Sequence, residues 1–522
     1  MMEFIKEKGD SFAHSYFYLA AMFFSCFLGW ALDSLYVTFL SISLFLIVTP
    51  ILTKDVRLLL ALCIMAFSGF RSRFYFNDAS VLIIITVVSL FISIVLFLYK
   101  NRNEMKFDPG TIFKSLVVFF AICLLSTIIR NGFNNHYAFD GYVYEIPDRI
   151  KDLNWVSHLK DYTYVPFENW TNYYNIMYGY LFSLIFILFI SLSLLISTIK
   201  RSDYKETYTK IMYIFSIMLI IETLIGYFIT YVIDTSHYNS RPYYILGWCE
   251  KNMFCVCIEI MIPFIFIGYL SNRKRIDYLV VIFVLSVLVL IGKSTGGKIT
   301  ILAMMLLISI ILVQQKLKNE ILIHRIKKSV FIAIITSFII FLTLLIITPT
   351  RNRVVSLVNS FITHNGRDVF WTWIFDYTFK TNALNALFGG SPSFLFELWN
   401  PFCFVFSYEN VDTTGIFMCH SNIIQSIAIG GIFGLLAFLY IVVESCLAIK
   451  KTKGNFKYLL LLFLFVGLFH GIIDNLFYSV FYLIPFLMIF SEKEELLDKK
   501  TKNNDEKEIT TYDANWYSVP SI

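Results

Sequence analysis

Glycines and lysines crowd one short stretch of the chain, residues 292–299, which reads GKSTGGKI. A phosphate-binding P-loop needs G-x-x-x-x-G-K followed by Ser or Thr, whose hydroxyl helps to hold magnesium. Here Ile299 follows Lys298, so that hydroxyl is missing, and the preceding segment has the composition of a membrane helix. We therefore exclude a nucleotide site. A glycine-rich turn that opens a helix, with Lys293 and Lys298 beside it, remains suited to an anion; a tight turn with two surface lysines is the alternative.

Arg367 is a further cation, and it lies in a segment with a helical pattern. Residues 363–377 read THNGRDVFWTWIFDY, and Asn365 is suited to cap a helix whose first turn carries Arg367. An apolar stripe at helical spacing follows, made of Phe370, Trp371, Ile374 and Tyr377. The pattern predicts an amphipathic helix in a membrane interface, with a guanidinium at the helix end that favours anions.

A histidine stands further along the same polar region. His420 begins the run H-S-N, which leads into an apolar helix with two adjacent glycines. An imidazole with a pKa of about 6.5 suits a general base that removes a proton from a hydroxyl group. His420 and His364 are the histidines of this polar region with that capacity. A histidine that only packs the base of the loop is the alternative interpretation of His420.

The composition identifies the scaffold that must position these residues. Of the 522 residues, 57% are hydrophobic and 15% are charged, whereas soluble proteins carry about 25% charged residues. Apolar runs of about 18 to 25 residues recur from end to end, and each is long enough to cross a bilayer core of about 30 Å. We expect an all-α fold, a polytopic bundle of transmembrane helices, and no nucleic-acid partner.

The apolar runs predict about fourteen spans. They lie near residues 11–32, 34–53, 57–70, 79–99, 111–130, 173–199, 208–233, 253–270, 275–292, 297–316, 327–349, 421–449, 456–473 and 475–490. Lys and Arg cluster in alternate loops, which places those loops and both termini in the cytoplasm by the positive-inside rule. The glycine–lysine turn then lies on the outer side, where ATP is not available.

This topology divides the chain into N-terminal helices (1–130), a first long outer loop (131–172), central helices (173–349), a large outer loop (350–420), C-terminal helices (421–491) and a charged cytoplasmic tail (492–522).

Several cations at the outer ends of spans do not follow the positive-inside rule. Because Arg binds phosphate oxygens in bidentate fashion, they point to an anionic lipid phosphate or pyrophosphate, with contact to lipid headgroups as the alternative. These cations are Arg71, Arg73, Arg130, Arg241, Lys293, Lys298, Arg351, Arg353 and Arg367.

The order and spacing of motifs within residues 275–475 resemble those of the bacterial O-antigen polymerase and O-antigen ligase superfamily, whose members have many spans and a large periplasmic loop. The motifs are Gly366-Arg367 with Trp371, Phe388-Gly389-Gly390, and His420-Ser421-Asn422 followed by Gly430-Gly431. The chain departs from the family at the outer turn. The family often has Ser-Arg-Gly where this chain has Ser294-Thr295-Gly296, so either Lys293 or Lys298 replaces that arginine or the phosphate clamp is rearranged.

The resemblance implies transfer of a glycan from undecaprenyl pyrophosphate to an acceptor hydroxyl, at the periplasmic face of the bacterial inner membrane and without metal or other cofactor. Arg367 would stabilise the departing pyrophosphate, and His420 would accept the proton of the hydroxyl. Pyrophosphate binding is expected from Arg71, Arg73, Arg241, Lys293, Lys298, Arg351 and Arg353, with His364, Trp371 and Asn422 in reserve. The expected partners are the undecaprenyl-pyrophosphate-linked oligosaccharide and membrane lipids, and a chain-length regulator is a further candidate.

Polymerase and ligase differ in the acceptor, which is another lipid-linked repeat unit for the first and the lipid A-core for the second. The extra spans and the long first outer loop favour the polymerase. A flippase or transporter of the same lipid-linked sugar is an alternative of another class. Such a protein would show paired charges deep in its spans and short outer loops, whereas the polar residues here gather on one side.

Several other polar residues keep open interpretations. Glu222, Glu259 and Glu444 lie within expected spans. A carboxylate there is a functional candidate, although the sequence assigns it no role. His470 and Asp474, near the end of the thirteenth expected span, are interpreted as structural. Cys403 and Cys419 share the large outer loop, where they could form a disulfide or remain free thiols.

Overall fold

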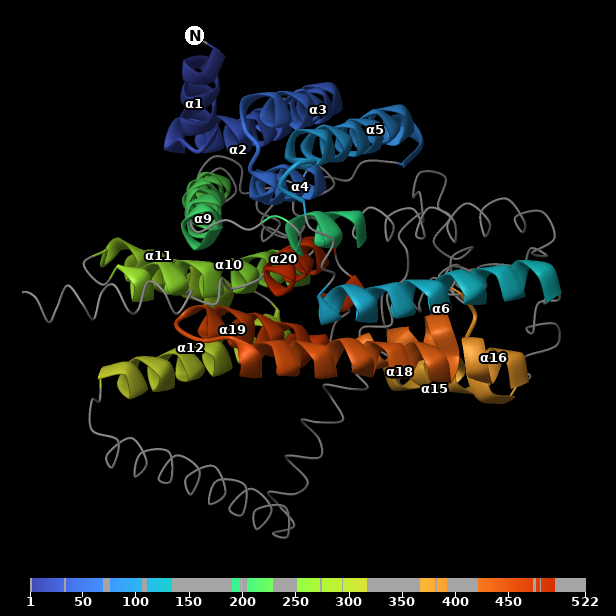
Figure 1. Cartoon of the computed structure of the whole chain (residues 1–522). Helices are drawn as coiled ribbons and strands as arrows, with labels where there is room; N and C mark the ends of the chain where they lie inside the picture. The colour runs from blue at the N-terminus through green and yellow to red at the C-terminus, as the bar shows by residue number, and fades with distance from the viewer. Residues whose placement is uncertain are drawn as a thin grey trace, which may run out of the picture.

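The computed structural model describes residues 2–31, 34–68, 76–105, 110–133, 190–197, 199, 204–228, 251–272, 275–292, 294–316, 367–380, 383–391, 421–472, 476–478 and 480–492 (Figure 1). Within these ranges the chain forms helices and turns and no strand, so this part of the protein is all-α, as expected.

The helices follow one another along the chain as short and long apolar rods. The N-terminal group is α1 (Met2–Ala13), α2 (Tyr16–Ala31), α3 (Leu35–Leu52), the 3-10 helix η1 (Val56–Leu58), α4 (Leu59–Ser68), α5 (Phe76–Asn101) and α6 (Thr111–Phe133). The central group is α9 (Tyr204–Phe228), α10 (Lys251–Ser271), α11 (Asp277–Ile291) and α12 (Thr295–Lys316). The remaining elements are α15 (Arg367–Lys380), α16 (Ala383–Phe388), α18 (Asn422–Lys451), α19 (Phe456–Phe469), η9 (His470–Ile472), η10 (Leu476–Tyr478) and α20 (Val480–Ser491).

Most expected spans with described residues coincide with one helix to within about a turn. The first one does not. An unbroken helix over 11–32 is wrong, because α1 ends at Ala13 and α2 begins at Tyr16. Ser15 lies at the break and its Oγ accepts a hydrogen bond from the backbone N of Tyr18 at 3.1 Å, as an N-capping serine does. The expected span 327–349 and most of 173–199 lie outside the described residues.

Length and composition mark the chain as a membrane protein. Five of the described helices are apolar enough to cross a membrane over at least 18 residues, namely 112–129 of α6, 204–226 of α9, 254–271 of α10, 296–315 of α12 and 422–451 of α18. The shorter apolar helices α11, α19 and α20 pack among them, and α3 packs against α2, α4 and α5. The total of fourteen spans and the orientation of the termini stay predictions.

Helix α10 forms the centre of the bundle. It contacts α9, α11, α12, α19 and α20, and 89% of its apolar stretch is buried. In Figure 1 the blue helices α2 to α5 group together above it, while α12, α18 and α19 lie below. A helix that is apolar all round is either enclosed by other helices or faces lipid, and neighbouring helices enclose α10.

A buried polar cluster ties the N-terminal helices to the end of α20. Arg57 is fully buried and donates from Nε and Nη2 to the two carboxylate oxygens of Glu492, at 2.7 and 2.8 Å. The Tyr208 hydroxyl donates to the same carboxylate at 2.7 Å. Asp55 is also buried and lies 3.6 Å from Arg57, and it accepts a hydrogen bond from His14 Nε2 at 2.9 Å. Such paired groups are stable inside a protein only while each keeps its partner.

His14 makes the stability of this cluster depend on pH. Burial lowers the pKa of His14. The hydrogen bonds to Asp55 and to the Asp10 carbonyl, together with the charges of both carboxylates, raise the pKa by more than burial lowers it, so the pKa lies above its ordinary 6.5. A raised pKa in the folded state stabilises the protein below the unfolded pKa of about 6.5, and that stabilisation is lost as the pH rises through the folded pKa. We expect thermal unfolding in detergent to show this loss, and His14→Gln to abolish it. Equal pH slopes in the two proteins above pH 6.5 would contradict the assignment.

Candidate functional site

The two glycine motifs of the sequence meet backbone to backbone. Helix α16 ends at Phe388, and the next residue, Gly389, adopts a φ of +67°. The amide N of Gly390 donates to the carbonyl of Ala428 at 2.9 Å, and that of Ser391 donates to the carbonyl of Ile429 at 3.0 Å. A Cβ on Gly389 would lie 2.5 Å from the amide N of Gly431, so no larger residue fits between these two backbone segments.

Helix α18 is broken at Gly431, so the expected single helix over 421–449 is wrong. Gly431 has φ 59° and ψ −143°, a backbone conformation that is essentially restricted to glycine. Eight residues of a straight helix rise about 12 Å. Here, however, a methyl group on Gly434 would overlap the carbonyl oxygen of Ser426, eight residues earlier. The first segment, residues 422–430, therefore folds back along the helix that follows it. We call this segment the half-helix.

Neighbouring elements satisfy the backbone groups that the break leaves free. The last carbonyls of a helix lack partners within the helix. At the end of the half-helix, Ala428 accepts from Gly390, and Ile429 accepts from Ser391 and also from the Ser126 hydroxyl of α6 at 2.8 Å. Non-helical backbone at membrane depth is tolerated where protein groups satisfy it in this way. The Phe388-Gly389-Gly390 motif is thus the cap of the half-helix.

Asn422 caps a second break at the start of the half-helix. It is 2% exposed, and its Nδ2 donates to the carbonyl of Gly467, in the last turn of α19, at 3.0 Å. Its Oδ1 accepts from the amide N of Phe477, in η10, at 3.1 Å. One amide side chain therefore bonds both to α19 and to the 3-10 helix η10, which precedes α20. Asn422 was a reserve binding residue, and the structure gives it this structural role.

Glu259 and His470 form a buried pair beside this break. His470 Nδ1 donates to Glu259 Oε2 at 2.7 Å, and the two residues are 1% and 0% exposed. Glu259 lies in the middle of α10, and His470 directly follows α19. The sequence interpretation left Glu259 without a role and treated His470 as structural. A carboxylate within a membrane span requires a hydrogen-bond donor as a partner, and this requirement is the sequence signal that could have predicted the pairing of Glu259 with a residue such as His470.

The glycine–lysine turn packs on the same face of α10. Ser294 is buried and its Oγ accepts from the amide N of Gly297 at 3.1 Å, so one of the first N–H groups of α12 is already used. A Cβ on Gly297 would lie 2.6 Å from Cβ of Cys255, four residues before Glu259. Close helix packing thus explains this glycine. Lys298 is half-buried one turn into α12, and anion binding there stays a prediction.

Helix α15 runs from Arg367 to Lys380, and its predicted cap, Asn365, lies outside the described residues. The helix packs against α16 and α18. Ile374 is fully buried and Trp371 is half-buried against the core, so both side chains of the predicted stripe that are described contact the protein. The side chain of Arg367 itself lies outside the described part of the chain.

The remaining candidates cannot be placed. The following residues lie outside the described ranges: Arg71, Arg73, Arg241, Lys293, Arg351, Arg353, His364, His420, Cys403 and Cys419. His420 directly precedes Ser421, which is 4% exposed at the start of the half-helix.

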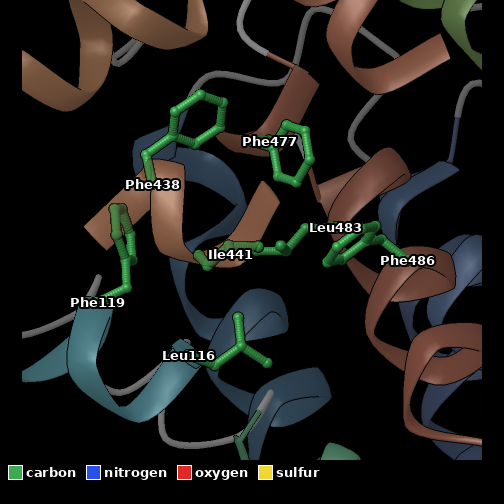
Figure 2. A pocket seen from close by; sticks show the side chains of 7 residues that line it. All are labelled: Leu116, Phe119, Phe438, Ile441, Phe477, Leu483 and Phe486. Atoms are coloured by element: carbon green, nitrogen blue, oxygen red, sulfur yellow. The ribbon is translucent and has the colours of Figure 1, made fainter. Parts of the chain in front are cut away.

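An apolar gap lies between α6, α18 and α20, directly beside this site (Figure 2). Its wall includes Phe477, whose backbone is bonded to Asn422 and whose ring meets that of Phe438 edge-on at 5.2 Å. The free space is about 10 Å³, roughly that of one water molecule. The gap is therefore packing space in this conformation. Its lining is Leu116, Phe119, Phe438, Ile441, Phe477, Leu483 and Phe486.

Comparison with known proteins gives no match: no family model, no curated protein and no solved structure is similar to the chain. The resemblance to the O-antigen superfamily accordingly depends on the motif residues of this chain alone.

Proposed function

We propose that this protein polymerises lipid-linked oligosaccharide repeat units by glycosyl transfer from undecaprenyl pyrophosphate. One observation carries the proposal. Three motifs that are separated in the sequence gather at α18: the Arg367 helix packs against α16 and α18, Gly390 of the glycine motif caps the end of the half-helix, and Asn422 holds its start. A set of motifs that resembles those of one enzyme family is more informative when its members assemble into a single feature.

The chemistry requires one bond to form and one to break. The acceptor hydroxyl oxygen attacks the anomeric carbon of the donor glycan, and the carbon–oxygen bond to the pyrophosphate breaks, with its electron pair leaving on the pyrophosphate. His420 is proposed to take the hydroxyl proton. Arg367, with Lys298 as a weaker contributor, is proposed to stabilise the negative charge that develops on the pyrophosphate, since fixed cations act strongly in a poorly solvated site.

The proposed location is the periplasmic face of the bacterial inner membrane, with both termini in the cytoplasm. The alternating Lys and Arg clusters support this orientation. In the same orientation, the cluster around Arg57 lies on the cytoplasmic side.

The test is a reconstituted reaction. Purified protein in liposomes is given a polyprenyl-pyrophosphate-linked repeat unit, either alone or with lipid A-core, and products are resolved by size. We expect a ladder of lipid-linked polymers from the repeat unit alone, unchanged by EDTA, because the proposed step uses cationic side chains and a histidine. Transfer only to lipid A-core would identify a ligase. Movement of the lipid across the bilayer without any new glycosidic bond would contradict the enzyme assignment.

A further inference from the structure

The carboxylate–imidazole pair of Glu259 and His470 lies where a helix ends inside the bundle. Helix α19 has 14 residues and is therefore about 21 Å long, shorter than a bilayer core. His470 follows its last residue, at the end where the helix dipole favours a cation. The Glu259 carboxylate on α10 lies 2.7 Å from Nδ1 of His470. This hydrogen bond fastens the end of α19 to α10.

The other side of the same turn is fastened to the half-helix. Gly471 follows His470, and a methyl group on Gly471 would overlap Nδ2 of Asn422. That amide donates to Gly467, three residues before His470. The 3-10 helix η9 is therefore held by two contacts: the hydrogen bond of His470 to Glu259 on α10, and the packing of Gly471 against the Asn422 amide of the half-helix. We call Glu259, His470 and Asn422 the polar bracket.

The half-helix depends on the bracket for its position. Its far end is capped by the Gly390 and Ser391 amides, and its near end is held by the bonds of Asn422 to Gly467 and Phe477. If the turn at His470 moves, Asn422 loses the carbonyl that it caps. Ser421, which is buried at the start of the half-helix, then moves as well.

We propose that Glu259 and His470 are positioning residues that set the place of the half-helix start, at Ser421 and Asn422, for glycosyl transfer. This inference rests on the function proposed above. Neither side chain contacts substrate, since both are fully enclosed by protein. They act through η9 and Asn422.

The first test is kinetic. Because a displacement of about 1 Å in a catalytic group can cost about 100-fold in rate, we expect Glu259→Ala and His470→Ala each to lower kcat by about that factor, with KM for the lipid-linked donor little changed. Glu259→Gln keeps an oxygen that can accept from Nδ1 and should restore most of the rate. The double variant should lose no more than either single one, since the two residues act as a unit. Losses that multiply would overturn the proposal.

Ser216→Ala is the control. Ser216 is fully buried on α9, and its hydroxyl donates to the Met212 carbonyl of its own helix and contacts Met261 of α10. We expect this variant to keep the kcat of the unaltered protein. An equal loss would show that removing any buried polar group beside α10 lowers the rate, and would overturn the positioning role.

The second test needs no activity. Ser421→Cys is introduced into a chain whose native cysteines are replaced, and the new thiol is treated with a water-soluble maleimide. We expect protection in that background and labelling when Glu259→Ala is added. A thiol that stays protected would refute the bracket. Labelling as expected in a protein that makes no polymer would leave the bracket standing and refute the proposed function.

Discussion

Replacing Arg367 with alanine should abolish chain elongation while the protein still inserts and folds. The pyrophosphate gains negative charge as the sugar leaves, and a guanidinium binds such a group through two parallel hydrogen bonds. Loss of one such stabilising group at a reacting centre costs about 100- to 1000-fold in rate. The measurement is the length of polysaccharide made in cells that carry the variant, together with the amount of protein in the membrane.

Lys380 offers a matched control at the other end of the same helix. It is exposed and pairs with Asp376 at 2.7 Å, so Lys380→Ala removes a cation from α15 without touching the half-helix. We expect that variant to elongate chains normally. Arg367→Lys should recover only part of the activity, because an ammonium group keeps the charge but not the bidentate geometry. Polysaccharide of normal length from Arg367→Ala would refute the assignment of this residue.

Replacing Gly431 with alanine should strongly destabilise the protein. Its φ of 59° strains a residue with a Cβ by about 1–3 kcal/mol. That Cβ would also lie 2.6 Å from the carbonyl oxygen of Ala386 and 2.7 Å from the amide N of Gly389, and overpacking of this kind costs about 1–3 kcal/mol more. We expect the free energy of unfolding to fall by about 2–6 kcal/mol. Thermal unfolding in mild detergent measures the change.

Gly110→Ala is the control for this substitution. Gly110 directly precedes α6, and a Cβ there would meet no atom within 4 Å. The same chemical change should therefore have little effect on stability. If Gly431→Ala proved as stable as Gly110→Ala, the fold-back of the half-helix would be wrong.

Part of the candidate site could be predicted from local patterns. The helix over residues 367–380 follows from an apolar run at helical spacing. The break in α18 at Gly431 could not be predicted from local patterns. Two glycines within an apolar run are equally typical of close helix packing. Whether they bend the chain depends on Gly389, about forty residues earlier, whose backbone occupies the space beside Gly431.

The buried pair shows the same limit more clearly. Glu259 and His470 are 211 residues apart in the chain. Nothing local to either residue distinguishes a carboxylate that is paired from one that faces a substrate. Only the packing of α19 against α10 brings the two groups within hydrogen-bonding distance.

By itself, the sequence determined that this is an all-α membrane protein and where most of its helices begin and end, because hydrophobicity and capping act through neighbouring residues. The tertiary structure alone decided that α18 folds back on itself, that Asn422 bonds to both α19 and η10, and that Glu259 forms a hydrogen bond with His470. The physical reason is that a buried polar group or a strained glycine is stable only beside its partner, and these partners come from distant parts of the chain.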